Sequence, residues 1–257
     1  MKFYILTRKR LVTLFSCALI GVVALIVAGT TASKVVATVN QEKEIPIYNV
    51  ETDEKVCALS FDAAWGNEQT ETLLNILDEY NVKSTFFLVR QWVDSFPDSV
   101  KEIAERGHDV GNHSTTHPHM NSLSSEKQKE EITSCNDAIE SLTGKAPTLF
   151  RAPYGEYNNS LVQNVKALDM YCVQWNIDSL DWKNPAPDDM VRRIEENLTQ
   201  GSIILLHNGA ENTPEALPKI IEAIQNKGYK IVPVSEIIPA GDYYTDVQGM
   251  MHLKDNA

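Results

Sequence analysis

In the segment Val56-Cys-Ala-Leu-Ser-Phe-Asp62, a short apolar run ends in a carboxylate. Four later runs repeat this arrangement and also end at a polar residue suited to catalysis. Helix-like segments separate the runs, and this alternation is typical of a parallel β/α sheet or barrel. Because the C-terminal ends of barrel strands face one way, we expect their terminal side chains to converge. The later runs are Asp109–Asn112 before His113, Thr148–Phe150 before Arg151, Val173–Ile177 before Asp178, and Ser202–Leu206 before His207.

The regular alternation begins at Lys55 and continues to about residue 239. We therefore predict an α/β fold, a small, distorted or incomplete (β/α) barrel of about seven parallel strands. Residues 34–54 are mixed and polar and are expected to form a linker, and residues 240–257 form a tail without a readable signal. Apolar spacing predicts helices at Gln69–Tyr80, Pro97–Arg106, Ser124–Leu142, Asn159–Leu168, Asp188–Leu198 and Pro214–Lys227.

An uncharged segment lies near the N-terminus, at residues 11–33, and Leu11–Ala28 is almost wholly apolar. The length of this segment is close to the ~20 residues that an α-helix needs to span a bilayer. The basic tip, residues 1–10, should stay cytoplasmic, so we expect a single-pass cell-membrane protein with an extracytoplasmic domain. The alternative is a cleaved signal peptide and secretion. We favour the anchor because a signal peptide has a shorter apolar region of ~7–15 residues and a cleavage site of the Ala-x-Ala kind.

Charge excludes some partners. The first 30 residues hold four basic and no acidic side chains, which leaves 19 basic and 35 acidic residues and a net charge of −16 in residues 31–257. Such an acidic body is a poor nucleic-acid binder. No protein partner is indicated.

Cys57, Cys135 and Cys172 lie beyond the apolar segment. Their odd number gives no obvious disulfide framework, although a Cys57–Cys172 bridge remains open.

Two histidines stand four residues apart in His113-Ser-Thr-Thr-His117. At this spacing, both imidazoles can reach one ion from a single helical turn. A lone pair of this kind is more often structural, but its place after a strand, together with Asp62 and His207, favours a metal site. Imidazoles suit zinc, cobalt, nickel or ferrous iron, so the predicted cofactor is a divalent metal, zinc before cobalt or nickel. His119 is expected to be exposed.

These residues belong to a pattern that resembles a known family. The chain is similar to the polysaccharide deacetylases with a NodB homology domain, carbohydrate esterase family four, over about residues 55–239. Each motif alone is weak, whereas all of them in order are strong. The motifs are Ser60-Phe-Asp-Ala-Ala-Trp-Gly66, His113-Ser-Thr-Thr-His-Pro118, Arg151-Ala-Pro-Tyr-Gly155, Asp178-Ser-Leu-Asp-Trp182 and Leu205-Leu-His207.

The resemblance implies hydrolysis of the acetamide of N-acetylated sugars in a cell-wall glycan, peptidoglycan first of all. By the same resemblance, Asp62 is the general base that takes a proton from water. His113 and His117 hold the metal, and Arg151 orients and tunes Asp62. This agrees with the chemistry of amide hydrolysis, because a metal can lower the pKa of water to ~7 and a carboxylate can then act as base.

Further residues follow from the resemblance. His207 protonates the leaving amine, and Asp181 keeps its imidazole oriented and charged. The backbone N–H of Tyr154 helps to hold the tetrahedral oxyanion. Trp182 forms a wall of the acetyl pocket, and Trp65 is grouped with these substrate contacts.

Simpler readings remain open for three of these positions. Arg151 could be a surface ion-pair partner, and Trp182 could fill the core. Asp178 is expected to be a structural cap rather than a catalyst.

The chain departs from the family pattern at Ala63. The first motif usually reads Asp-Asp, and its second carboxylate is the third protein ligand of the metal. Three outcomes are open: a weaker two-histidine site completed by water, Asp62 recruited as ligand, or no metal. The Ala-Ala-Trp-Gly version resembles a sporulation-associated branch of the family in which this carboxylate is also missing.

Two other functions compete with a membrane-anchored deacetylase. One is a catalytically silent protein that binds glycan, which the alanine at position 63 favours. The other is an amidohydrolase that acts on a small non-glycan amide. Release of acetate from wall polymer separates the first from a deacetylase, and comparison of polymer with small amides separates the second.

Overall fold

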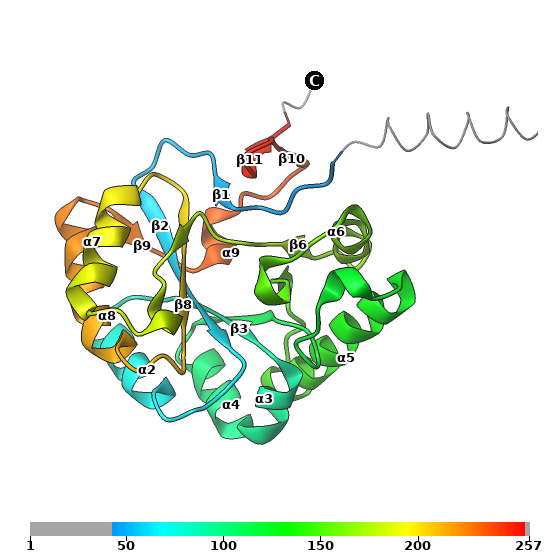
Figure 1. Ribbon diagram of the computed structural model, residues 1–257, viewed down its shortest axis with the longest axis horizontal. Helices are drawn as coiled ribbons and strands as arrows, with labels where there is room; N and C mark the ends of the chain where they lie inside the picture. The colour runs from blue at the N-terminus through cyan, green and yellow to red at the C-terminus, as the bar shows by residue number, and fades with distance from the viewer. Residues whose placement is uncertain (1–42, 255–257) are drawn as a thin grey trace, which may run out of the picture. The chain divides into compact units, whose positions relative to one another are not determined.

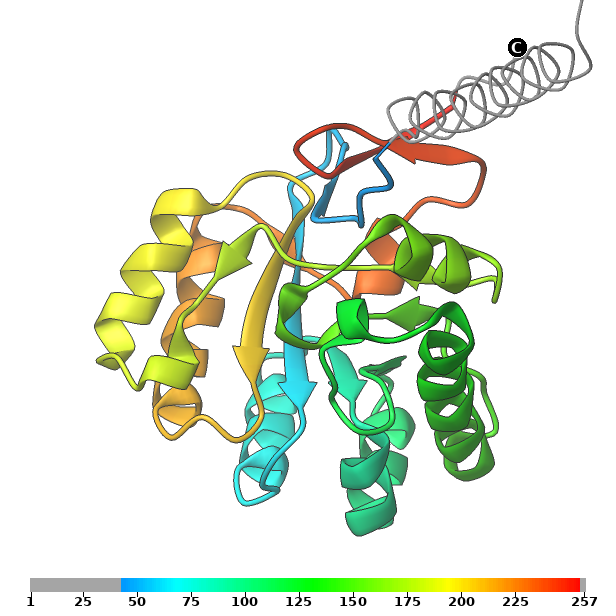
Figure 2. The ribbon, with the colours of Figure 1, turned by 45° about the vertical axis from the view of Figure 1, so that its right-hand side comes forward.

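The computed structural model describes residues 43–254, and parallel strands form its centre with helices packed outside them (Figure 1). β2 (Val56–Ala63) and β8 (Ser202–His207) lie side by side and run in the same direction (Figure 2). The sheet continues from β2 through β3, β4 and β5 to β6 with every pair parallel, while β7 pairs with the other edge of β8. The predicted incomplete (β/α) barrel of parallel strands is confirmed. The remaining strands of this series are β3 (Thr85–Leu88), β4 (Asp109–Asn112), β5 (Leu149–Phe150), β6 (Tyr171–Cys172) and β7 (Ile177–Asp178).

The helices follow the apolar spacing of the sequence. α2 (Thr70–Glu79) buries Leu73, Leu74 and Leu77 along one side. Ser124 caps α5 by accepting a hydrogen bond from the backbone N–H of Lys127, which satisfies one of the free N–H groups of the first turn. The other helices are α3 (Arg90–Ser95), α4 (Pro97–Glu105), α5 (Ser125–Thr143), α6 (Asn159–Lys166), α7 (Pro187–Asn197), α8 (Thr213–Asn226) and α9 (Val234–Ile237). Of these, α3 was not expected.

Side chains alternate along β2, and this alternation separates the core from the site. Leu59, Phe61 and Ala63 are fully buried in one cluster with the leucines of α2. Ser60 and Asp62 occupy the intervening positions and so point to the opposite face of the sheet. Burial of each large apolar side chain contributes about 1.5–3 kcal/mol, which fixes the register of β2 and therefore the direction of Asp62.

Two segments without a predicted element complete the sheet. Residues 34–54 were expected to be a linker, but β1 (Asn49–Val50) lies within them and pairs with β8 and β11. Residues 240–257 were read as a tail, but β10 (Tyr243–Thr245) and β11 (Met250–Leu253) form a hairpin there. Ile47 also pairs with Val173, just beyond β6, so the N-terminal segment spans from β6 to β8. A further short strand, β9 (Lys230–Ile231), pairs with β2. The strand expected at Lys230–Pro233 is thus present as β9. β1, β10 and β11 are short, and β1 and β11 pair across some 200 residues, which is why periodicity did not reveal them.

The three cysteines of the described region, Cys57, Cys135 and Cys172, are buried and free, so the open Cys57–Cys172 bridge is not formed. Between residues 43 and 254, no helix is both long and apolar enough to cross a membrane. The predicted basic tip and membrane anchor, residues 1–10 and 11–33, lie outside the described residues.

Candidate active site

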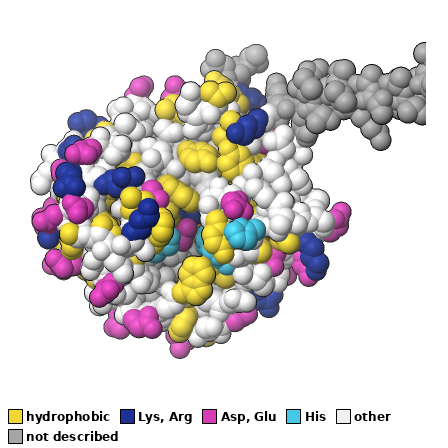
Figure 3. All heavy atoms as spheres, in the orientation of Figure 1, with side chains coloured by type: hydrophobic (Ala, Val, Ile, Leu, Met, Phe, Trp, Pro, Cys, Tyr) yellow, Lys and Arg dark blue, Asp and Glu magenta, His cyan; other side chains and the backbone are white. Residues whose placement is uncertain are grey.

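A cleft of about 650 Å³ opens at the C-terminal ends of the parallel strands. Figure 3 shows histidine side chains in a hollow on one face, with hydrophobic side chains on both sides of it. The cleft is within the range of ~300–1,000 Å³ that is usual for ligand sites. Of the predicted site residues, seven line it: Asp62, Trp65, His113, His117, Tyr154, Trp182 and His207. The other two, Arg151 and Asp181, are fully buried behind the wall of the cleft.

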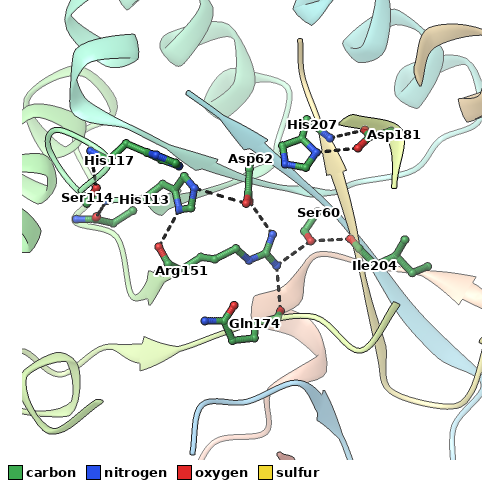
Figure 4. Close-up of polar contacts among 11 residues, drawn as sticks. Ser60, Asp62, His113, Ser114, His117, Arg151, Gln174, Asp181, Ile204 and His207 are labelled. Atoms are coloured by element: carbon green, nitrogen blue, oxygen red, sulfur yellow. Dashed lines mark hydrogen bonds and ion pairs between the residues drawn. The ribbon is translucent and has the colours of Figure 1, made fainter. Parts of the chain in front are cut away.

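Arg151 reaches from the end of β5 to the carboxylate of Asp62 (Figure 4). Its Nη1 lies 2.7 Å from Asp62 Oδ1, and its Nη2 donates to Ser60 Oγ at 2.8 Å. The guanidinium also stacks over the ring of Phe87, 4.0 Å from its centroid. Arg151 is fully buried, so it is not a surface ion-pair partner. The ion pair instead fixes Oδ1 of Asp62, while Oδ2 faces Nε2 of His113.

The two histidines of the second motif come together, with ring centroids 5.0 Å apart. Nδ1 of His113 lies 2.8 Å from the carbonyl oxygen of Arg151, and its Nε2 lies 3.5 Å from Asp62 Oδ2. His117 has a positive φ of 56°, which an L-residue rarely adopts. Its Nδ1 is buried without a hydrogen-bond partner in the described part of the chain. The rings of Trp65 and Tyr154 instead meet it edge to face, at 4.8 and 4.6 Å.

His207, at the end of β8, is paired with the fully buried Asp181 of η3 (Asp181–Lys183). Nδ1 of the imidazole lies 2.7 Å from Asp181 Oδ1, and the backbone N–H of His207 donates to Asp181 Oδ2 at 2.7 Å. In the β2–β8 register, His207 is opposite Asp62. The two residues thus stand side by side although 145 positions separate them in sequence.

Three aromatic side chains form the exposed rim of the cleft. Trp65, Tyr154 and Trp182 are 67%, 54% and 55% exposed, so Trp182 does not fill the core. Tyr154 is in the left-handed region with φ 59°. The exposed ring of His119 stacks on Tyr154 at 4.4 Å. Exposed aromatic faces with a polar edge are suited to contacts with sugar rings.

Asp62 and His207 have pKa values shifted in opposite directions. Burial opposes ionisation of Asp62, but the charge of Arg151 and its hydrogen bond outweigh it and lower the pKa of Asp62. Burial also disfavours a charged His207, yet the hydrogen bond and charge of Asp181 outweigh it and raise the pKa of His207. The surroundings therefore favour the carboxylate form of Asp62 and the protonated form of His207.

The two histidines of the second motif, His113 and His117, both have lowered pKa values, unlike His207. Burial lowers the pKa of His113, and burial together with the neighbouring His113 lowers the pKa of His117 to about 4. Both rings are then neutral, which is the form that binds a metal.

The residues fit a divalent ion in part. His113 uses Nδ1 for a backbone carbonyl, the usual arrangement of a metal-binding histidine, and its Nε2 lies on the side of Asp62, 3.5 Å from Oδ2. The unpartnered buried Nδ1 of His117 shows that this second imidazole also has bonding capacity to spare. The third position is Ala63, which has no ligand atom. Among residues 43–254 there is accordingly no group of three or more His, Cys, Asp or Glu side chains arranged to hold a metal.

Some residues of the site did not emerge from sequence reasoning. Ser60 stands within the first motif, two residues before Asp62, and its binding of Arg151 could have been inferred from the strand alternation. Trp175 and Asn208 line the cleft without any motif that marks them. Asp178 lies in the wall of the cleft, and its Oδ1 accepts the backbone N–H of Leu180, which agrees with the expected capping role.

Comparisons with known proteins agree with this fold. A profile described as polysaccharide deacetylase matches residues 49–173. A peptidoglycan-N-acetylglucosamine deacetylase of Bacillus cereus is 32% identical over 196 residues, which cover 74% of this chain and 92% of that protein. The peptidoglycan-N-acetylmuramic acid deacetylase PdaC of Bacillus subtilis is 32% identical over 188 residues, which cover 73% of this chain and 40% of PdaC.

A solved structure carries a further description. Wild-type BA3943 of Bacillus anthracis, called a CE4 family pseudoenzyme, matches with a TM-score of 0.73 and 34% identity over 75% of this chain and 68% of its own. A mutant of the same protein, with a TM-score of 0.73 and 35% identity over 75% of this chain and 70% of its own, is described as having restored enzymatic activity. The chain spans 60% and 65% of the length of two other curated relatives that it matches.

The fold and the cleft define an incomplete (β/α) barrel protein with a carboxylate, Asp62, beside an imidazole, His207, and two further histidines at the C-terminal strand ends. The chain belongs to the polysaccharide deacetylase family, carbohydrate esterase family four, whose members include proteins named as peptidoglycan deacetylases.

The pKa of His207 should depend on Asp181. The folded value is raised, so His207 keeps its proton above the ordinary range and loses it only as pH rises through the raised pKa. We expect Asp181→Asn to lower the pKa of His207, because the hydrogen bond and the charge of the adjacent carboxylate raise it. NMR titration of the ring, and the basic limb of kcat/KM, measure this. Asp178→Asn is the matched control, since Asp178 is the weakest of the carboxylates that raise this pKa; an equal shift in both variants would contradict the assignment.

Proposed function

We propose that this protein hydrolyses the acetamide of N-acetylated sugars in peptidoglycan. The observation that carries the proposal is the pairing of Asp62 with His207 across β2 and β8, in one cleft and with opposite pKa shifts. Hydrolysis of an amide needs a base for water and an acid for a poor leaving group, and these two side chains are poised for the two tasks. The family, and the relatives named as peptidoglycan deacetylases, support the same substrate class.

The chain's own residues then divide the work. Asp62, held by Arg151, accepts a proton from the attacking water, because its free oxygen is not occupied by the guanidinium. The backbone N–H of Tyr154 stabilises the negative charge that develops on the acetyl oxygen. His207 donates its proton to the leaving amine, and acetate and a free amino sugar result. Trp182 and Trp65 pack against the sugar and the acetyl group.

His113 and His117 are the residues that would hold a divalent ion, preferably zinc. When bound there, the ion would supply Lewis acidity, which lowers the pKa of water and polarises the acetyl carbonyl. Ala63 removes the third protein ligand, so we propose a weakened site completed by water.

A second candidate function is supported by the same alanine. A protein that binds glycan without hydrolysing it would keep the aromatic rim and could lose the ligand, and one structural relative is described as a pseudoenzyme. The deacetylase and the silent binder differ in one measurable product, acetate.

We further propose that residues 11–33 attach the protein to the cell membrane, with the barrel on the outer side. The uncharged segment and the basic residues before it support this. Fractionation of cells should find the full chain with the membrane after a high-salt wash, whereas a chain that begins at residue 35 should be released. Recovery of the full chain in the wash would contradict the anchor.

Acetate release tests the catalytic pair. We expect Asp62→Asn and His207→Ala each to lower kcat/KM on N-acetylated wall glycan by roughly 10²–10⁴-fold, because each removes one proton transfer. Acetate is measured by an enzyme-coupled assay, and circular dichroism confirms the fold of each variant. A folded His207→Ala protein that works at the unmodified rate would remove His207 from the mechanism. If the unmodified protein and Asp62→Asn are equally inactive on every N-acetylated glycan, the result favours a catalytically silent glycan-binding protein over a deacetylase.

A restored carboxylate tests the metal site. Ala63 is fully buried and is the last residue of β2, where the strand leaves the sheet beside Asp62, so Ala63→Asp buries a carboxylate that needs a cation. Without metal, we expect the free energy of unfolding of this variant to be about 3 kcal/mol or more below that of the unmodified protein. Added zinc should restore much of this free energy and should bind the variant about 10-fold or more tightly than it binds the unmodified protein. Thermal unfolding with and without zinc measures this, and Ala63→Asp combined with His117→Ala is the control. If zinc does not change the thermal stability of the Ala63→Asp variant, position 63 faces away from the two histidines.

A further inference from the structure

Thr213, the first residue of α8, touches the acid–base machinery although no motif includes it. Its side chain is fully buried, and its hydroxyl donates to Asp181 Oδ2 at 2.9 Å. Pro214 follows it, and because proline has no N–H it suits the first turn of a helix. The N-terminal end of α8 is therefore anchored on the carboxylate that holds His207.

The Asp181 carboxylate has its two oxygens engaged in different ways. Oδ1 faces the ring of His207, while Oδ2 accepts both the backbone N–H of His207 and the hydroxyl of Thr213. Within residues 43–254, no arginine or lysine forms an ion pair with this carboxylate, so neutral donors and one imidazole must stabilise it. For a fully buried charge, each donor therefore matters more than it would at the surface.

The same carboxylate closes a loop. His207 and Thr213 bind it from the two ends of residues 208–212, and the first residues of that loop, Asn208, Gly209 and Ala210, line the cleft. Rotation of the carboxylate about its bond to Cβ would move Oδ1 away from the imidazole. The bond from Thr213 opposes this rotation because it holds Oδ2 from the side of α8.

We propose that Thr213 is a positioning residue, which fixes the plane of the Asp181 carboxylate so that His207 keeps its proton on Nδ1 and presents Nε2 toward Asp62. Figure 4 shows the unbound nitrogen of the His207 ring on the side of Asp62. The carboxylates that act on His207 are Asp181, Asp62 and Asp178, and only Asp181 is hydrogen-bonded to the ring. Loss of the threonine hydroxyl should thus loosen the ring through Asp181 alone.

Thr213→Val tests this, because valine keeps the shape and loses the hydroxyl. In the full chain with histidine labelled by ¹⁵N, we expect the Nδ1–H proton of His207 to exchange with water about tenfold faster or more, since one charge-assisted hydrogen bond is lost. Thr213→Ser should retain slow exchange. The signal is assigned by its absence in His207→Gln.

Thr85→Val is the matched control. Thr85 is also fully buried and its hydroxyl also donates to a carboxylate, that of Asp109, but at the opposite end of the strands. Slow exchange in the folded Thr213→Val protein would overturn the proposal, and so would equal acceleration by Thr85→Val, which would reflect general loosening. If the valine variant does not fold, Thr213→Ala carries the same expectation.

The inference rests on the proposed function only for its catalytic meaning. Proton exchange at His207 is measured without substrate, so the positioning role can hold in a protein that releases no acetate. Conversely, where acetate is released, Thr213→Val should lower kcat while Thr85→Val leaves it unchanged. Equal kcat for Thr213→Val and the unmodified protein would contradict a catalytic consequence of the positioning.

Discussion

The buried ion pair between Arg151 and Asp62 is the interaction on which the rest of the site depends. Removal of two charges from water costs several kcal/mol each, and only close partners offset that cost. Arg151 finds them in Asp62, in Ser60 and in the backbone carbonyl of Gln174. Ser60 passes the constraint on by donating to the carbonyl of Ile204 in β8. One guanidinium therefore links β5, β2 and β8 at the level of the cleft.

This arrangement also explains why two neighbouring groups can hold opposite protonation states. Asp62 and His207 are cross-strand partners, so each would favour the charged form of the other. What separates their roles is a second partner: Arg151 lies against the carboxylate and Asp181 lies against the imidazole. Asp62 and His207 are thus each half of a separate ion pair, and the other half, Arg151 or Asp181, is fully buried, where water screens its charge little.

The sequence predicted the parts of the fold in which local pattern and tertiary role agree. The apolar strand β2 and the amphipathic α2 are examples, because the residues that define their periods are the residues that they bury. The hairpin of β10 and β11 was missed, since its pairing with β1 is set by contacts across some 200 residues. The site shows the same division. Asp62 and His207 stand out at strand ends, whereas Thr213 matters only because the fold brings it to Asp181.

Ala63 affects the two histidines of the cleft without affecting the ion pairs of Asp62 and His207. The ion pairs that set protonation involve Arg151 and Asp181, and neither contacts position 63 through a hydrogen bond or ion pair in the described region. The rim side chains Trp65 and Tyr154 pack against His117 and hold that ring without a hydrogen bond to Nδ1. The alanine at position 63 therefore leaves the two histidines without a third protein ligand, while Asp62, His207 and the aromatic rim keep their geometry. Under the proposed function, binding of glycan and hydrolysis would draw on different residues of one cleft, so a change at a single position would be able to abolish hydrolysis and spare binding.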